Sequence, residues 1–148
     1  MFFDTHTHLD DEKFEYLRGE LLTELPAAGI APIMAIAADR ESCFSAVKLA
    51  EENNFMFAAV GQHPDAAQHM DEQQFQELKE LAVHPRVKCI GEIGLDYHWP
   101  EDTDKEKQKY WFIRQMELAE ELGLPVSIHS RDAMADTLEI LRKFPKVQ

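Results

Sequence analysis

The sequence is poor in basic residues. Its 148 residues include 15 Lys and Arg but 28 Asp and Glu, so the formal net charge is -13. Proteins that bind nucleic acid mainly through their surface are usually basic, because most of their affinity comes from neutralising phosphates. The composition excludes that kind of binder. It remains compatible with an enzyme that meets an anionic substrate through bound cations, which are the largest local charges in such a site.

Cysteine and long apolar segments are also scarce. The two cysteines, Cys43 and Cys89, fall in segments with the patterns of a helix and a strand, so no disulfide framework or CxxC site is expected. No apolar run approaches the length of a membrane span, and no basic region leads into an apolar one at the N-terminus. We therefore expect an intracellular, cytoplasmic protein with no cleaved signal and no membrane partner.

What is present is a regular alternation of strand and helix patterns. With 45% hydrophobic residues, the chain is expected to form one globular domain over residues 1–148. Short apolar runs predict five strands, at the start of the chain and at 31–37, 55–61, 87–96 and 125–130. Helical periodicity and capping residues predict five helices, from Asp10-Asp11-Glu12 to Pro26 and at about 39–53, 71–85, 104–122 and 131–144.

This alternation predicts an α/β fold with parallel strands, either an open doubly wound sheet or part of a (β/α)8 barrel. The polar residues favour the barrel, because the carboxyl ends of all barrel strands share one mouth. Four of the five predicted strands end in side chains that can bind metal or transfer protons: His6, His8, His63, Glu92 and His129. A full barrel has about 250 residues. We therefore expect a partial TIM (β/α)8 barrel with about five of its eight βα units.

His6 and His8 are the first candidate metal ligands along the chain. Residues two apart on a strand point to the same face, roughly 6.6 Å apart along its axis, so the two imidazoles aim together, with Asp4 one step behind. Such a pair can hold a divalent ion with bonds of about 2.0 to 2.1 Å. The alternative is a polar strand end at the surface, and the spacing alone does not decide between them.

Four motifs in order resemble those of the TatD family of metal-dependent deoxyribonucleases, which are amidohydrolase-type barrels. They are His6-Thr7-His8, Gly61-Gln62-His63-Pro64, Gly91-Glu92-Ile93-Gly94-Leu95-Asp96-Tyr97 and Ile128-His129-Ser130-Arg131. Each motif alone is a weak signal, but all four lie on the expected elements and the resemblance covers the whole chain.

The resemblance implies a role for each matching residue. His6 and His8 correspond to ligands of a first metal, Glu92 to a catalytic carboxylate that bridges two metals, and His129 to a ligand of the second. Family members add a histidine after the sixth strand and an aspartate after the eighth, and this sequence ends before either. Residues 145–148 have the pattern expected at the start of a sixth strand.

Two further residues are expected to contact substrate, His63 and Arg131. Arg131 begins a predicted helix, where backbone N–H groups favour phosphate. A salt bridge from Arg131 to Asp96 or Glu92 is an equally good interpretation, and His63 could simply be a turn residue fixed by Pro64. Asp96 could orient ligands or lead into the next helix.

The resemblance implies hydrolysis of DNA phosphodiesters by metal-activated water, as in a 3′-5′ exonuclease, with two divalent ions and DNA as the partner. Zinc, manganese and magnesium are all compatible with the family, although nitrogen-rich ligand sets suit magnesium less well. Two alternatives remain: hydrolysis of a small ester, amide or phosphotriester at the same site, and a catalytically incomplete fragment. The open edges of a partial barrel also predict self-association or pairing with another chain.

Overall fold

The computed structural model describes residues 1–99 and 101–148, and it contains one sheet of five parallel strands. The strands are β1 (Phe2–Thr7), β2 (Ile30–Ile36), β3 (Met56–Val60), β4 (Val87–Asp96) and β5 (Val126–Arg131). They lie in the sheet in chain order, each paired in parallel with the next. A barrel has this sequential order, whereas in a doubly wound sheet the strand order reverses partway. The predicted α/β partial barrel is confirmed.

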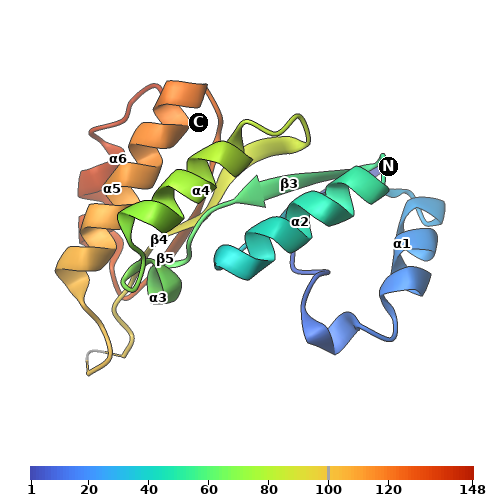
Figure 1. Cartoon of the computed structure of the whole chain (residues 1–148), viewed down its shortest axis with the longest axis horizontal. Coiled ribbons are helices and arrows are strands. Elements are labelled where there is room, and N and C mark those ends of the chain that lie inside the picture. The colour runs from blue at the N-terminus through green and yellow to red at the C-terminus, as the bar shows by residue number, and fades with distance from the viewer. Residues whose placement is uncertain (100) are drawn as a thin grey trace.

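Helices connect the strands and cover one side of the sheet. They are a 3₁₀ turn η1 (Glu12–Phe14), α1 (Arg18–Ala27), α2 (Arg40–Glu52), α3 (Pro64–Ala67), α4 (Glu72–Ala82), α5 (Lys105–Leu122) and α6 (Met134–Leu141). Helices α1, α2, α4 and α5 follow one another along the outside of the sheet (Figure 1). In the described part of the chain, none of the helices combines the length and apolar character that a membrane span requires.

Acidic residues begin three of the main helices as the sequence predicts. The carboxylate of Asp39 accepts a hydrogen bond from the Ser42 N–H at 2.8 Å, and Asp71 and Asp104 cap α4 and α5 in the same way. Each cap provides an acceptor for an N–H group of the first turn that has none within the helix. Gly123 ends α5 in the left-handed conformation, with φ 64°. These caps fix where the helices begin and end relative to the strands.

The sheet is strongly curved. Neighbouring strands are about 4.8 Å apart, so the outer strands of a flat five-stranded sheet would lie about 19 Å from each other. Here the outer strands are β1 and β5, yet the Nδ1 atom of His6 is 3.4 Å from the Oγ atom of Ser127. This curvature gives the sheet an inner and an outer face, and it brings the first and last strands together.

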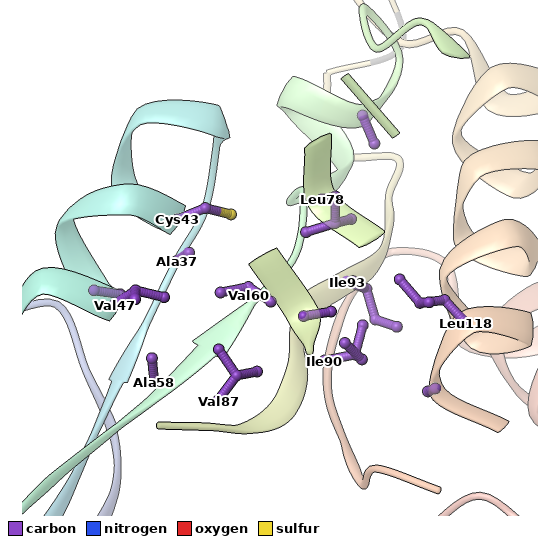
Figure 2. Packing of buried hydrophobic residues seen from close by; sticks show 14 of the residues in the cluster. Ala37, Cys43, Val47, Ala58, Val60, Leu78, Val87, Ile90, Ile93 and Leu118 are labelled. Atoms are coloured by element: carbon purple, nitrogen blue, oxygen red, sulfur yellow. The ribbon is translucent and has the colours of Figure 1, made fainter. Parts of the chain in front are cut away.

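The main core lies between the outer face of the sheet and the helices. Leu118 of α5 packs with Ile90 and Ile93 of β4, and Cys43 and Val47 of α2 lie against the neighbouring strands (Figure 2). The inner face carries a smaller buried group formed by Met34, Ile36, Ala59 and Cys89. A cavity of about 330 Å³ opens beside it, lined in part by Phe3, Thr5, His6 and Ser127.

The structure differs from the predicted local structure in four places. The first helix is divided into η1 and α1, and the Arg18 side chain at the start of α1 donates hydrogen bonds to backbone carbonyls of the turn before η1, at 2.6 Å for that of Leu9. The short helix α3 was not predicted. Helix α6 begins at Met134 rather than Arg131, because β5 extends to Arg131 and Asp132 has a φ of 55°. The final residues form no strand, although Gln148 accepts a hydrogen bond from the Val126 N–H at 2.7 Å.

The edge strand β1 exposes two large apolar side chains, Phe2 and Phe3, which are 74% and 51% exposed. Edge strands with apolar side chains favour pairing with another chain. We expect light scattering to show association that increases with protein concentration and that Phe2→Lys weakens. Tyr16→Lys is the matched control, because Tyr16 is 95% exposed but lies outside the strands. A monomer at all concentrations would contradict this expectation.

Candidate metal centre

The carboxyl ends of β1, β3, β4 and β5 bring the candidate ligands to one place. His6 and His8 lie at the end of β1, Glu92 lies in β4 and His129 in β5. His63 follows β3 and caps α3. The structure therefore brings together all five residues that the sequence places at strand ends, although they are separated by up to 123 positions in the chain.

The first group joins β1 to β4. The Nε2 atoms of His6 and His8 are 3.2 Å apart, and the Nε2 atom of His6 is 3.4 Å from Oε2 of Glu92. Asp4 lies behind this group, where its carboxylate accepts a hydrogen bond from the His6 backbone N–H at 3.2 Å. Asp4 thus holds the backbone of the strand rather than an imidazole ring.

The second group joins β3, β4 and β5. The Nδ1 atom of His129 is 3.3 Å from Oε1 of Glu92, and the His63 and His129 rings meet edge to face with centroids 4.2 Å apart. Ligand atoms of His63, Glu92 and His129 all lie within 4.8 Å of one another. His63, which the sequence assigns to substrate, is therefore also placed where it could bind metal.

These spacings fit divalent ions. Four ligands at about 2.1 Å around a tetrahedral ion are roughly 3.4 Å from one another, which is close to the observed separations. Glu92 belongs to both groups, and each of its oxygens faces a different histidine. Imidazole and carboxylate together suit zinc or manganese. The residues present fit a metal centre in which one carboxylate is shared.

The pKa shifts of His63 and Glu92 agree with this fit, whereas that of His129 favours a ring proton that a bound metal ion would have to displace. Burial lowers the pKa of His63, and the neighbouring His129 adds to the effect, so His63 favours the neutral form that binds metal. The hydrogen bond with His129 lowers the pKa of Glu92, which favours the ionised carboxylate. The same hydrogen bond raises the pKa of His129, with a further contribution from Asp96.

Asp96 connects the site to Arg131. Its Oδ2 atom lies 2.8 Å from Nε2 of His129 and accepts a hydrogen bond from Nε of Arg131, also at 2.8 Å. Of the two interpretations of Arg131, the salt bridge to Asp96 is therefore present in the structure. The role of Arg131 in binding substrate stays a prediction. Its side chain is 45% exposed at the mouth of the site.

Two buried glutamines of α5 accept hydrogen bonds from the backbone at the ends of β3 and β4, and the sequence analysis did not identify them. Oε1 of Gln115 accepts a hydrogen bond from the Gln62 N–H at 2.7 Å, directly before His63. Oε1 of Gln108 accepts from the Asp96 N–H at 2.9 Å. The available signal was two polar residues seven positions apart within an otherwise apolar helix face, which places them on the same side of the helix.

Close approach of β4 and β5 depends on glycine. A Cβ atom on Gly91 would lie 2.7 Å from Cβ of Ser127, and one on Gly94 would lie 1.9 Å from the carbonyl oxygen of His129. Gly94 also has a φ of 146°, which L-residues with a side chain rarely adopt. The glycines that flank Glu92 therefore let the strand bearing His129 pack directly beside it.

The stability of the metal-free protein is expected to depend on Asp96 at low pH. Burial alone would raise its pKa, but hydrogen bonds from Arg131, the His98 N–H and His129 outweigh this and lower it to about 2. The pKa in the unfolded chain is about 3.9. A depressed pKa stabilises the folded state above the unfolded value, and that stabilisation is lost as the pH falls from about 4 towards 2.

Urea denaturation near pH 5 and near pH 2.5 tests this expectation. The wild-type protein should lose on the order of 2 kcal/mol more than Asp96→Asn over this interval, because the variant lacks the titrating group. Equal losses in the two proteins would show that Asp96 is not held in its ionised form by these contacts.

The fold and the clustered ligands define a protein of the α/β-barrel class with a candidate metal centre at the mouth. The family model described as "TatD related DNase" matches residues 3–148. The chain belongs to this family, as its motifs indicate, and the predicted resemblance is confirmed.

Curated relatives and solved structures agree with this assignment. The chain is 40% identical over 143 residues to the "Uncharacterized metal-dependent hydrolase YabD" of Bacillus subtilis, covering 97% of this chain and 56% of YabD. It is 33% identical over 132 residues to the "3'-5' ssDNA/RNA exonuclease TatD" of a Rahnella species, covering 88% and 50%. The crystal structure of YjjV, a TatD homolog from Escherichia coli, superposes with a TM-score of 0.87 at 29% identity, covering 99% and 57%. The chain spans about half the length of these relatives.

Proposed function

We propose that the chain binds two divalent metal ions and takes part in metal-dependent hydrolysis of DNA at a 3′ end. His6, His8 and Glu92 would hold one ion, and Glu92 and His129, with His63 beside them, would hold the other. The observation that carries this proposal is the position of Glu92, whose Oε2 atom lies 3.4 Å from His6 and whose Oε1 atom lies 3.3 Å from His129.

When bound, a pair of divalent ions supplies Lewis acidity that activates water and stabilises the charge of a phosphodiester during hydrolysis. The residues of the chain hold and orient the reacting groups. Glu92 and the histidines provide ligand atoms that are already close together. Arg131, at the exposed edge of the site, supplies a positive charge that can hold a substrate phosphate.

The choice of DNA as substrate is supported by the name of the Rahnella relative, a 3′-5′ exonuclease of single-stranded DNA and RNA. The net charge of -13 opposes binding of nucleic acid by the general surface. Substrate would therefore meet the protein through the metal centre and Arg131, and binding should depend on metal.

The test is hydrolysis of a single-stranded oligonucleotide labelled at its 5′ end, with zinc, manganese or magnesium added. The proposal predicts metal-stimulated removal of 3′ nucleotides that His6→Ala or Glu92→Gln abolishes, while the exposed His69→Ala has no effect. Activity that survives both site substitutions would contradict it. Hydrolysis of small esters, amides or phosphotriesters but not of oligonucleotides would favour the alternative substrate class.

The assay is also run with the part of YabD that the chain does not match added as a second polypeptide, because the chain covers 56% of that relative. Metal binding without activity by the chain alone, followed by activity in the mixture, would show that the chain supplies only part of a catalytic site. Activity of the chain alone would exclude this alternative.

A further inference from the structure

We propose that Asp96 is a positioning residue for the metal centre, which holds the neutral His129 ring with its proton on Nε2 so that Nδ1 is free to bind metal. This inference rests on the metal centre proposed above and assigns a function to a residue outside its ligand groups. It follows from the contacts and burial of the Asp96 carboxylate, and from the distances of the two His129 ring nitrogens to Asp96 and Glu92.

Asp96 is the most buried carboxylate in contact with the site. Its side chain is 2% exposed, whereas that of Glu92 is 14% exposed. Oδ1 accepts a hydrogen bond from the His98 N–H at 3.0 Å, and Oδ2 accepts one from Arg131 at 2.8 Å. A buried carboxylate with these donors is ionised, and an ionised carboxylate can only accept hydrogen bonds.

The two carboxylates beside His129 therefore compete for one ring proton. Nε2 lies 2.8 Å from Asp96, and Nδ1 lies 3.3 Å from Glu92. A hydrogen bond to a charged acceptor is strongest at the shorter distance and in the drier environment, and both conditions favour Asp96. In the neutral ring the proton is on Nε2, and the lone pair of Nδ1 points to the side where Glu92 and the candidate metal position lie.

The position of Asp96 is itself fixed from two sides. Arg131 binds the same oxygen that His129 binds, and its backbone lies opposite Asp96 in the neighbouring strand β5. Gln108 of α5 accepts a hydrogen bond from the Asp96 backbone N–H at 2.9 Å, and Gln108 is 1% exposed. Asp96 therefore has a rigid backbone and an oriented side chain, as a residue that fixes a metal ligand requires.

A direct role in metal binding is the competing account, because ligand atoms of His63, Asp65 and Asp96 also lie within 4.8 Å of one another. Both oxygens of Asp96 already accept hydrogen bonds, from His98 and from Arg131. A cation bound at Asp96 would have to lie beside the guanidinium of Arg131 or displace it. The contacts favour the positioning role.

The first test uses the metal-free wild-type protein and therefore does not depend on the metal proposal. Long-range ¹H–¹⁵N NMR spectra at alkaline pH, where the ring is neutral, should show a protonated Nε2 and an unprotonated Nδ1 for His129. In Asp96→Asn this preference should be lost. A wild-type ring protonated on Nδ1 would overturn the inference, even if the metal centre itself is shown to exist.

The second test is calorimetric titration with Zn²⁺. Loss of a partner that orients a metal-bound histidine typically lowers metal affinity 10- to 100-fold, and this loss is expected for Asp96→Asn. Asp132→Asn is the matched control, because Asp132 carries an exposed carboxylate directly after β5 and binds the His98 ring instead of His129. Its affinity should stay within about twofold of the wild type, since surface substitutions have small effects.

Two outcomes of the titration would overturn the inference. One is a wild-type affinity in Asp96→Asn, and the other is an equal loss in Asp65→Asn, which would identify Asp96 as a direct ligand with His63 and Asp65. If wild-type protein binds no Zn²⁺, the metal centre fails, while the NMR result still decides whether Asp96 orients His129.

Discussion

Glu92→Gln is expected to weaken the binding of both divalent ions by more than about 100-fold. Removing a residue that only orients a ligand costs 10- to 100-fold in affinity, so removing a ligand shared by two ions should cost more. Glu92 contacts His6 through Oε2 and His129 through Oε1, and glutamine replaces one of these oxygens with an amide group. Calorimetric titration with Mn²⁺ and with Zn²⁺ measures the effect.

The control for this prediction is Glu41→Gln, which removes the same charge from an exposed position in the first turn of α2. It should leave affinity and stoichiometry unchanged. Retention of wild-type binding by Glu92→Gln would mean that Glu92 is a strand-end carboxylate without metal. Loss of one ion only would mean that Glu92 is a ligand but does not bridge.

Gly94→Ala is expected to lower the free energy of unfolding by at least about 3 kcal/mol, because it combines overpacking with backbone strain. Its Cβ atom would lie 1.9 Å from the carbonyl oxygen of His129, and alanine does not readily adopt a φ of 146°. Strand β5 must move away from β4 to relieve the clash. Metal affinity should fall as well, because His129 moves with β5. Urea denaturation and metal titration measure the two effects.

Gly19→Ala provides a matched control within the same protein. Gly19 lies in α1 and has no atom within 4 Å of the position that a Cβ would occupy. Alanine is favoured over glycine in a helix, so this variant should be more stable by up to about 1 kcal/mol. Similar effects of the two substitutions would show that β4 and β5 do not pack as closely as the structure indicates.

Much of the fold could be predicted because local signals and packing agree in this chain. Apolar runs marked the strands, the acidic caps Asp39, Asp71 and Asp104 marked the starts of three helices within a residue, and Gly123 marked the end of α5. The start of the chain was predicted less well. The first helix is divided, and the Arg18 side chain binds backbone carbonyls of the turn before η1, which periodicity does not show.

The candidate site was predicted in its residues but not in its connections. Parallel strands in a barrel explain why His6 and His129 should meet, and the structure places both beside Glu92. The strand pattern does not show which carboxylate a histidine contacts, so the contact between His129 and Asp96 is evident only from the structure. Gln115 belongs to none of the four motifs, because it contacts only the backbone next to His63.

We expect histidines from β1 and β5 to share divalent ions with Glu92. The most direct test is anomalous X-ray scattering from crystals of the protein grown with Zn²⁺ or Mn²⁺. We expect one anomalous peak bounded by His6, His8 and Glu92, and a second bounded by Glu92 and His129. Saturating metal that gives no peak at either position, or peaks only at surface carboxylates elsewhere, would contradict this expectation.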